Sequence, residues 1–185
     1  MKKLVLASAA ALLPALASAA GLLGSTVDVR YHYDDGALLL HTLDSVLVGA
    51  GAEFTCPGAA QLCQALTQPT QTLDLGDSSI RYDYVGLGGA TAGFNNVPMN
   101  FLSVESLFSG ATITGVQLST NIVGLDASRL SFAAHSVQVD LHGLGLGSQA
   151  FFQLDLQTAP VPEPASAALL LLGLGTLFAR RQRRD

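Results

Sequence analysis

Apolar and polar residues alternate along four stretches of the chain. Apolar side chains occupy every second position of residues 27–33, 80–84, 137–141 and 152–156, with polar or charged residues between them. A period of two is that of a β-strand with one buried face and one solvent-facing face. Residues 112–123 are rich in Thr, Ile and Val and also favour a strand. The dominant secondary structure predicted from the pattern is therefore β.

Clusters of Gly, Asn and Asp separate these stretches. They occur at residues 34–36, 49–51, 86–89, 95–96 and 143–145, and such clusters mark turns. Short alternating strands between turns predict an all-β fold over residues 20–158. We expect an antiparallel β-sandwich or jelly roll of about eight to ten strands. Residues 61–67 fit a single helical turn.

The first 19 residues have the form of a secretory signal peptide. Lys2 and Lys3 are followed by an apolar region at residues 4–16 and by Ala17-Ser18-Ala19, a cleavage site of the A-x-A type. We expect signal peptidase to cut after Ala19, so that the mature chain begins at Ala20. The alternative is an N-terminal anchor that is never cut.

A second apolar segment lies near the C-terminus. Val161-Pro162-Glu163-Pro164 precedes an uncharged run at residues 165–179, and a stop-transfer cluster follows it: Arg180, Arg181, Arg183 and Arg184. The prolines hold Glu163 extended, which suits display in an enzyme's groove. The run reaches about 22 Å as a helix, less than the roughly 30 Å core of a bilayer, and snorkelling arginines reduce the mismatch. We expect a linker over 159–164, a transmembrane sorting helix over 165–179 and a basic cytoplasmic tail over 180–185.

This tail resembles the PEP-CTERM sorting domain, the substrate class of exosortases. The resemblance rests on Val161 to Pro164, the apolar run and the final arginines, in that order at the end of the chain. It implies that the tail is inserted transiently in the inner membrane and removed near Pro-Glu-Pro by an exosortase. It also implies a destination at the surface or in the exopolysaccharide matrix of a Gram-negative bacterium. The alternative is a plain C-terminal membrane anchor.

The middle of the chain is acidic. Between Ala20 and Val161 there are three arginines, no lysine and twelve acidic residues, a net charge of −9. Such a surface disfavours nucleic acid as a partner, because it repels phosphates. Four carboxylates in or beside predicted turns are candidate Ca²⁺ ligands: Asp34, Asp35, Asp74 and Asp77. The alternative is that they cap turns by accepting backbone N–H groups.

Cys56 and Cys63 are the two cysteines of the chain. An even number in an exported protein predicts a disulfide. A metal pair is the alternative, although six intervening residues are not a C-x-x-C spacing.

No motif predicts catalysis or a cofactor other than Ca²⁺. The glycines at 86–89 and 143–147 match neither a dinucleotide-binding motif nor a P-loop, and we interpret them as turns. The histidines have no metal-binding spacing and are interpreted as surface or edge residues: His32, His41, His135 and His142. The chain has no G-x-S-x-G motif, and its carboxylates form no recognisable glycosidase pair.

We therefore expect an exported, non-enzymatic β protein with a structural or adhesive role in a biofilm matrix. The alternative is a secreted Ca²⁺- or glycan-binding module, and an extracellular hydrolase is a more distant one. Glycan binding usually uses exposed aromatic rings. The chain has no Trp, and the alternation places four tyrosines inward: Tyr31, Tyr33, Tyr82 and Tyr84.

Overall fold

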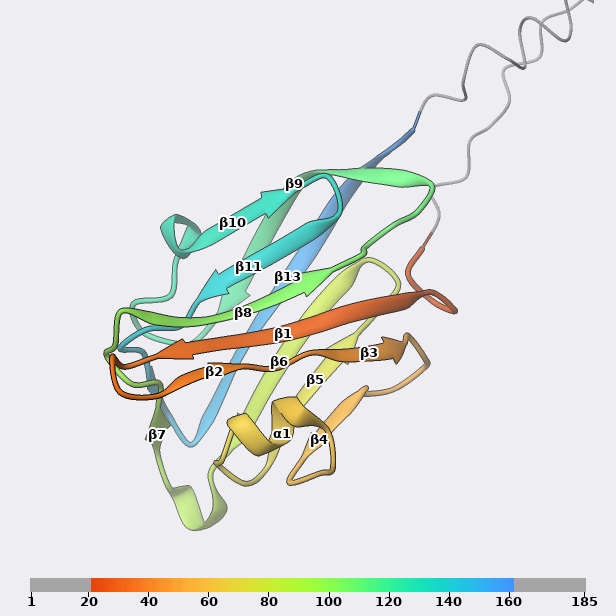
Figure 1. Ribbon diagram of the computed structural model, residues 1–185. Coiled ribbons are helices and arrows are strands. Elements are labelled where there is room, and N and C mark those ends of the chain that lie inside the picture. The colour runs from red at the N-terminus through yellow and green to blue at the C-terminus, as the bar shows by residue number, and fades with distance from the viewer. Residues whose placement is uncertain (1–20, 162–185) are drawn as a thin grey trace, which may run out of the picture.

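The computed structural model describes residues 21–161 of the 185-residue chain. This part contains thirteen strands, one short α-helix and two 3₁₀ turns (Figure 1). The predicted all-β class with antiparallel sheets is confirmed. The predicted signal peptide at 1–19, the sorting helix at 165–179 and the basic tail lie outside the described residues. Within residues 21–161, no helix has the length and apolar character needed to cross a membrane.

The first sheet has the strand order β10-β11-β8-β1-β2, with β3 pairing to the first half of β1. Its strands are β10 (Leu130–Ala133), β11 (Ser136–Asp140), β8 (Met99–Glu105), β1 (Thr26–Asp34), β2 (Leu39–His41) and β3 (Asp44–Leu47). All of these pairings are antiparallel. β1 therefore has a partner on both sides, β8 on one and β2 with β3 on the other.

The second sheet has the order β4-β5-β6-β13-β9, and Figure 1 shows it passing behind the first. Its strands are β4 (Phe54–Cys56), β5 (Gln71–Leu75), β6 (Ser79–Val85), β13 (Gln149–Pro160) and β9 (Ala111–Thr120). A separate two-stranded pair joins β7 (Ala92–Gly93) to β12 (Gly145–Leu146). The helix α1 (Gln61–Ala65) connects β4 to β5, and the 3₁₀ turns are η1 (Leu87–Gly89) and η2 (Ala127–Arg129).

One hydrophobic core receives side chains from both sheets. Val27, Val29 and Tyr31 of β1 are buried at alternate positions, as the sequence pattern predicts, and so are the apolar residues of β6, β11 and β13. At the centre, the Tyr82 ring stacks on that of Phe152, with 5.2 Å between centroids and 17° between planes. Burial of these alternate residues is the main force that holds the two sheets together.

Some strand boundaries differ from the prediction. The structure has thirteen strands rather than the expected eight to ten. Two of the additional strands, β7 and β12, have only two residues each and show no alternation. β9 ends at Thr120 rather than at residue 123, since the Thr120 hydroxyl accepts the Ile122 N–H at 3.0 Å and turns the chain. The helical turn predicted at residues 61–67 is confirmed, because α1 lies inside this range. The turn predicted at residues 86–89 is also confirmed, and Gly88 and Gly89 adopt positive φ there, after β6.

The last strand runs further than expected. Residues 159 and 160, predicted to begin a linker, are part of β13 and pair with Thr112 and Ala111 of β9. The Val161 N–H then donates to the Gly110 carbonyl at 3.2 Å. A proline is tolerated in this strand because β6 pairs with β13 only as far as Asp155, so Pro160 has β9 as its one neighbour in the sheet.

Candidate functional site

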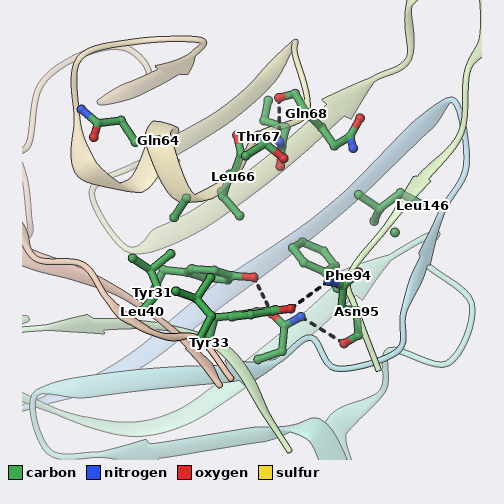
Figure 2. Close-up of a pocket in the computed structure, with 15 residues that line it drawn as sticks. Tyr31, Tyr33, Leu40, Gln64, Leu66, Thr67, Gln68, Phe94, Asn95 and Leu146 are labelled. Atoms are coloured by element: carbon green, nitrogen blue, oxygen red, sulfur yellow. Dashed lines mark hydrogen bonds between the residues drawn. The ribbon is translucent and has the colours of Figure 1, made fainter. Parts of the chain in front are cut away.

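A pocket of about 360 Å³ opens beside α1 (Figure 2). Tyr31 and Tyr33 enter it from β1 and Asn100 from β8, while Gln71 enters from β5. Residues 64–68, after and within α1, and residues 93–95 form the remaining sides, with Leu38, Leu40 and Leu146. Its size falls at the lower end of the range of small-molecule sites in proteins.

The polar side chains of the pocket are bonded to one another. The Tyr31 hydroxyl donates to Asn100 Oδ1 at 2.6 Å, and Asn100 Nδ2 donates to the Asn95 carbonyl at 3.1 Å. Asn95 Nδ2 donates to the Tyr33 hydroxyl at 3.0 Å, which itself donates to Asp35 Oδ2 at 3.1 Å. Figure 2 shows the part of this network that joins lining residues, along one side of the pocket. It fixes both phenol rings and leaves further lone pairs and N–H groups for a ligand.

Gln71 holds the opposite side of the pocket. It is only 2 % exposed, and its Nε2 donates to the Gln68 carbonyl at 2.8 Å. Its Oε1 accepts a hydrogen bond from the Tyr82 hydroxyl. A buried amide with both ends bonded is a rigid support, because breaking either bond would leave an unpaired polar group in the core. The loop at residues 66–68 is thereby attached to the second sheet.

The wall formed by α1 is fixed from two directions. Cys56 and Cys63 form the predicted disulfide and join α1 to β4. Asp44 of β3 accepts the N–H groups of Gln61 and Leu62 at 3.0 and 2.7 Å. A carboxylate at this position satisfies the free amides of a helix's first turn. A five-residue helix therefore keeps its place although it is too short to be stable alone.

The pocket carries no charged side chain among its lining residues. Burial raises the pKa of Tyr31 to about 12, and the neighbouring Tyr33 adds to this shift. Tyr31 is therefore a neutral hydrogen-bonding group at every physiological pH. Phe94 and the leucines supply apolar contact, while amides and phenols supply hydrogen bonds. The arrangement suits an uncharged ligand that has both an apolar face and hydroxyl groups.

The four candidate Ca²⁺ ligands do not come together. Asp34 ends β1 and Asp35 begins the turn to β2, and they accept the N–H groups of Gly36, Ala37 and Leu38 at 2.7–2.9 Å. Asp74 faces Arg81 across the strand pair, and Asp77 accepts the Leu23 N–H at 3.4 Å. Residues 21–161 contain no group of three or more metal-ligating side chains. Turn capping accounts for the bonds of Asp34 and Asp35.

The histidines fall into three places. His32 and His41 lie directly opposite each other on β1 and β2, with 2.6 Å between their Nδ1 atoms. His135 Nδ1 lies 2.9 Å from the Leu107 carbonyl, and His142 lies beside Asp140 at 3.4 Å. The sequence does not indicate the contact between His32 and His41, because it depends on the register of the β1–β2 hairpin.

The comparisons with known proteins concern the C-terminus. A family model described as the PEP-CTERM protein-sorting motif matches residues 160–184. The chain carries a PEP-CTERM sorting motif. This motif marks it as an exported protein that an exosortase recognises and processes. No curated protein and no solved structure matches the chain.

The PEP-CTERM motif begins at the end of β13. Pro160 and Val161 are its first two residues and also the last two of the described domain. The other predicted processing residues lie outside the described part: Ala17, Ala19 and Ala20 at the signal cleavage site, Pro162, Glu163 and Pro164 of the sorting motif, and Arg180, Arg181, Arg183 and Arg184. The sequence does not predict the pocket, because its lining residues come from four segments that are far apart along the chain.

Proposed function

We propose that this protein is a non-enzymatic component of the surface or extracellular matrix of a Gram-negative bacterium. Its β domain, built as a sandwich of the two sheets, has a structural or adhesive role, and an exosortase removes its tail. Export begins with signal-peptide cleavage after Ala19, and the segment at 165–179 holds the chain transiently in the inner membrane.

The observation that carries this proposal is the PEP-CTERM motif at residues 160–184. The β domain that precedes the motif also supports a non-enzymatic role. The pocket beside α1, which is lined by uncharged side chains, presents phenols and amides, which donate and accept hydrogen bonds but do not exchange protons readily near neutral pH. Such a site favours binding over acid–base catalysis.

The test is intact-mass analysis of the full chain expressed in a host that has an exosortase. We expect a product that starts at Ala20 and has lost the residues after the Pro-Glu-Pro motif. Glu163→Gln, which removes one charge with almost no change in size, should leave the tail uncut, as should deletion of the exosortase gene.

Glu105→Gln is the matched control, because it makes the same chemical change inside the domain. This variant should be processed like the wild type. Normal cleavage of Glu163→Gln, or of the wild type in the host that lacks the exosortase, would contradict the proposed route. A full-length product in the cytosol would contradict export itself.

A second candidate function is binding of a neutral glycan in the pocket. The observation that favours it is the combination of Tyr33 and Phe94 rings with the Asn95 amide around one opening. Sugars offer an apolar ring face to aromatic side chains and hydroxyls to amides. On this account the protein attaches to matrix polysaccharide through the pocket.

A panel of neutral polysaccharides, scored by thermal shift and by co-sedimentation, tests this function. Asn95→Ala should abolish the shift for any polysaccharide that binds, whereas Asn96→Ala should not, since Asn96 lies outside the pocket lining. A flat response across the panel would reject glycan binding. The same thermal shift with CaCl₂ tests the Ca²⁺ alternative.

A further inference from the structure

A pair of imidazoles stands on the outer face of the first sheet, away from the pocket. His32 of β1 and His41 of β2 are directly opposed across the hairpin, and their ring centroids are 4.8 Å apart. The two Nδ1 atoms face each other at 2.6 Å, so one ring donates its proton to the other. Their convergence is a consequence of strand register, because residues opposite each other in a ladder point to the same face.

The surroundings hold His32 in place. Its ring stacks on that of Phe101 from β8, with centroids 4.5 Å apart and 26° between planes. His41 lies on the edge strand and is exposed, so its ring is free to adjust its angle. The site therefore combines one fixed and one adjustable nitrogen ligand.

Two charged side chains, Arg30 and Glu105, lie near the pair. Burial lowers the pKa of His32, and His41 and Arg30 lower it further, while Glu105 opposes them. Arg30 itself pairs with Glu105, with Nε 2.9 Å from Oε2. Neutral imidazole is the form that binds metals, because the ligating nitrogen must carry a free lone pair.

We propose that His32 and His41 form a surface site for a divalent transition metal, with Cu²⁺ preferred. The metal takes the place of the proton that the two Nδ1 atoms share. That proton moves to Nε2 of the ring that donated it, through solvent, so a neutral pair binds the ion without net release of a proton. Water fills the remaining coordination positions, since the described residues bring no third metal ligand to the pair.

The geometry needs only a small adjustment. Two nitrogens at about 2.0–2.1 Å from one ion lie roughly 2.9 Å apart at a right angle and about 3.3 Å apart at the tetrahedral angle. The present 2.6 Å separation must therefore open by a few tenths of an ångström. Imidazole ligands suit Cu²⁺, Ni²⁺ and Zn²⁺, and affinity at a given nitrogen site is greatest for Cu²⁺ among the divalent first-row metals.

Isothermal titration of the full chain with CuCl₂, in mild detergent, a non-coordinating buffer and with no histidine tag, tests the site. We expect His41→Ala to weaken the tightest binding step by more than about tenfold, because losing a ligand costs at least as much as losing a group that supports one. His41→Gln should behave in the same way. The electron paramagnetic resonance spectrum of the wild-type complex should show coupling to two nitrogens that His41→Ala reduces.

His142→Ala is the matched control, since His142 lies beside a carboxylate and offers the obvious competing site. It should leave the tightest step unchanged, and circular dichroism should show that all variants are folded. Equal Cu²⁺ affinity in the wild type and in His41→Ala would overturn the proposal, and so would a wild-type protein that does not bind Cu²⁺. Loss of binding in His142→Ala alone would assign the metal to the other histidine.

Discussion

Removing the disulfide between Cys56 and Cys63 should destabilise the domain by an amount that the loop length sets. The two residues are seven positions apart, and closing a loop of this size in the unfolded chain contributes about 2.4 kcal/mol at 25 °C in the chain-entropy description. For a domain of this size that loss corresponds to a fall in Tm of roughly 5–10 °C. The local effect is concentrated on α1, because the disulfide is one of the few contacts that hold this short helix, beside the Asp44 cap and the buried Leu62 side chain.

The measurement is urea unfolding of the oxidised and the reduced wild-type protein, followed by far-ultraviolet circular dichroism. Comparing these two states avoids any change of side chain. The variant Cys56→Ala/Cys63→Ala is the control, and a reductant should not alter its unfolding curve. If oxidised and reduced wild type unfold within about 0.5 kcal/mol of each other, the crosslink does not constrain the unfolded chain as argued. Faster amide exchange at residues 61–68 on reduction would support the assignment to α1.

Three further predictions concern the core and the titrating groups. Phe152→Ala should lower the free energy of unfolding by about 3–5 kcal/mol in urea titrations, because Phe152 is 0 % exposed and stacks on Tyr82; no loss would contradict its central position. Backbone N–H groups of the β1–β2 turn lower the pKa of Asp35. The stability that the ionised Asp35 gives the folded domain is therefore present above the ordinary carboxyl pKa of about 3.9, and it is lost as the pH falls through the lowered pKa. The difference in urea midpoint between wild type and Asp35→Asn should therefore vanish in acid, and a constant difference would refute this. Tyr31 should ionise near pH 12 in a phenolate absorbance titration, so its stabilising effect is present below pH 10 and is lost as the pH rises through 12; ionisation at about 10 would contradict its burial.

The strands that the sequence predicts best are those with one apolar and one polar face. In β1, β6, β11 and β13 the apolar residue at every second position is buried, so the period of two identifies both the strand and its inner face. The disulfide is equally accessible to prediction, because the chain offers a single pair of cysteines.

β8 shows why the pocket was not predictable. Asn100 points inward and is only 1 % exposed, whereas Phe101 points outward. A polar residue therefore faces the core and an aromatic residue faces outward, the opposite of the usual strand pattern. This arrangement is stable because Tyr31 and the Asn95 carbonyl satisfy the Asn100 amide, while His32 covers the Phe101 ring. The partners come from distant segments, so the sequence does not show that they meet. Departures of this kind from a local pattern tend to occur at functional positions.

The continuity between β13 and the PEP-CTERM motif constrains the encounter with the exosortase. Val161 is hydrogen-bonded to Gly110 at the sheet's end, and three residues of extended chain reach at most about 11 Å beyond it. An enzyme that acts on Pro164 must therefore either come within about 11 Å of the folded domain or separate the end of β13 from β9. The new C-terminus of a chain cut directly after Pro164 therefore stays within about 11 Å of the end of β13, so whatever is joined to it lies close to the sheet.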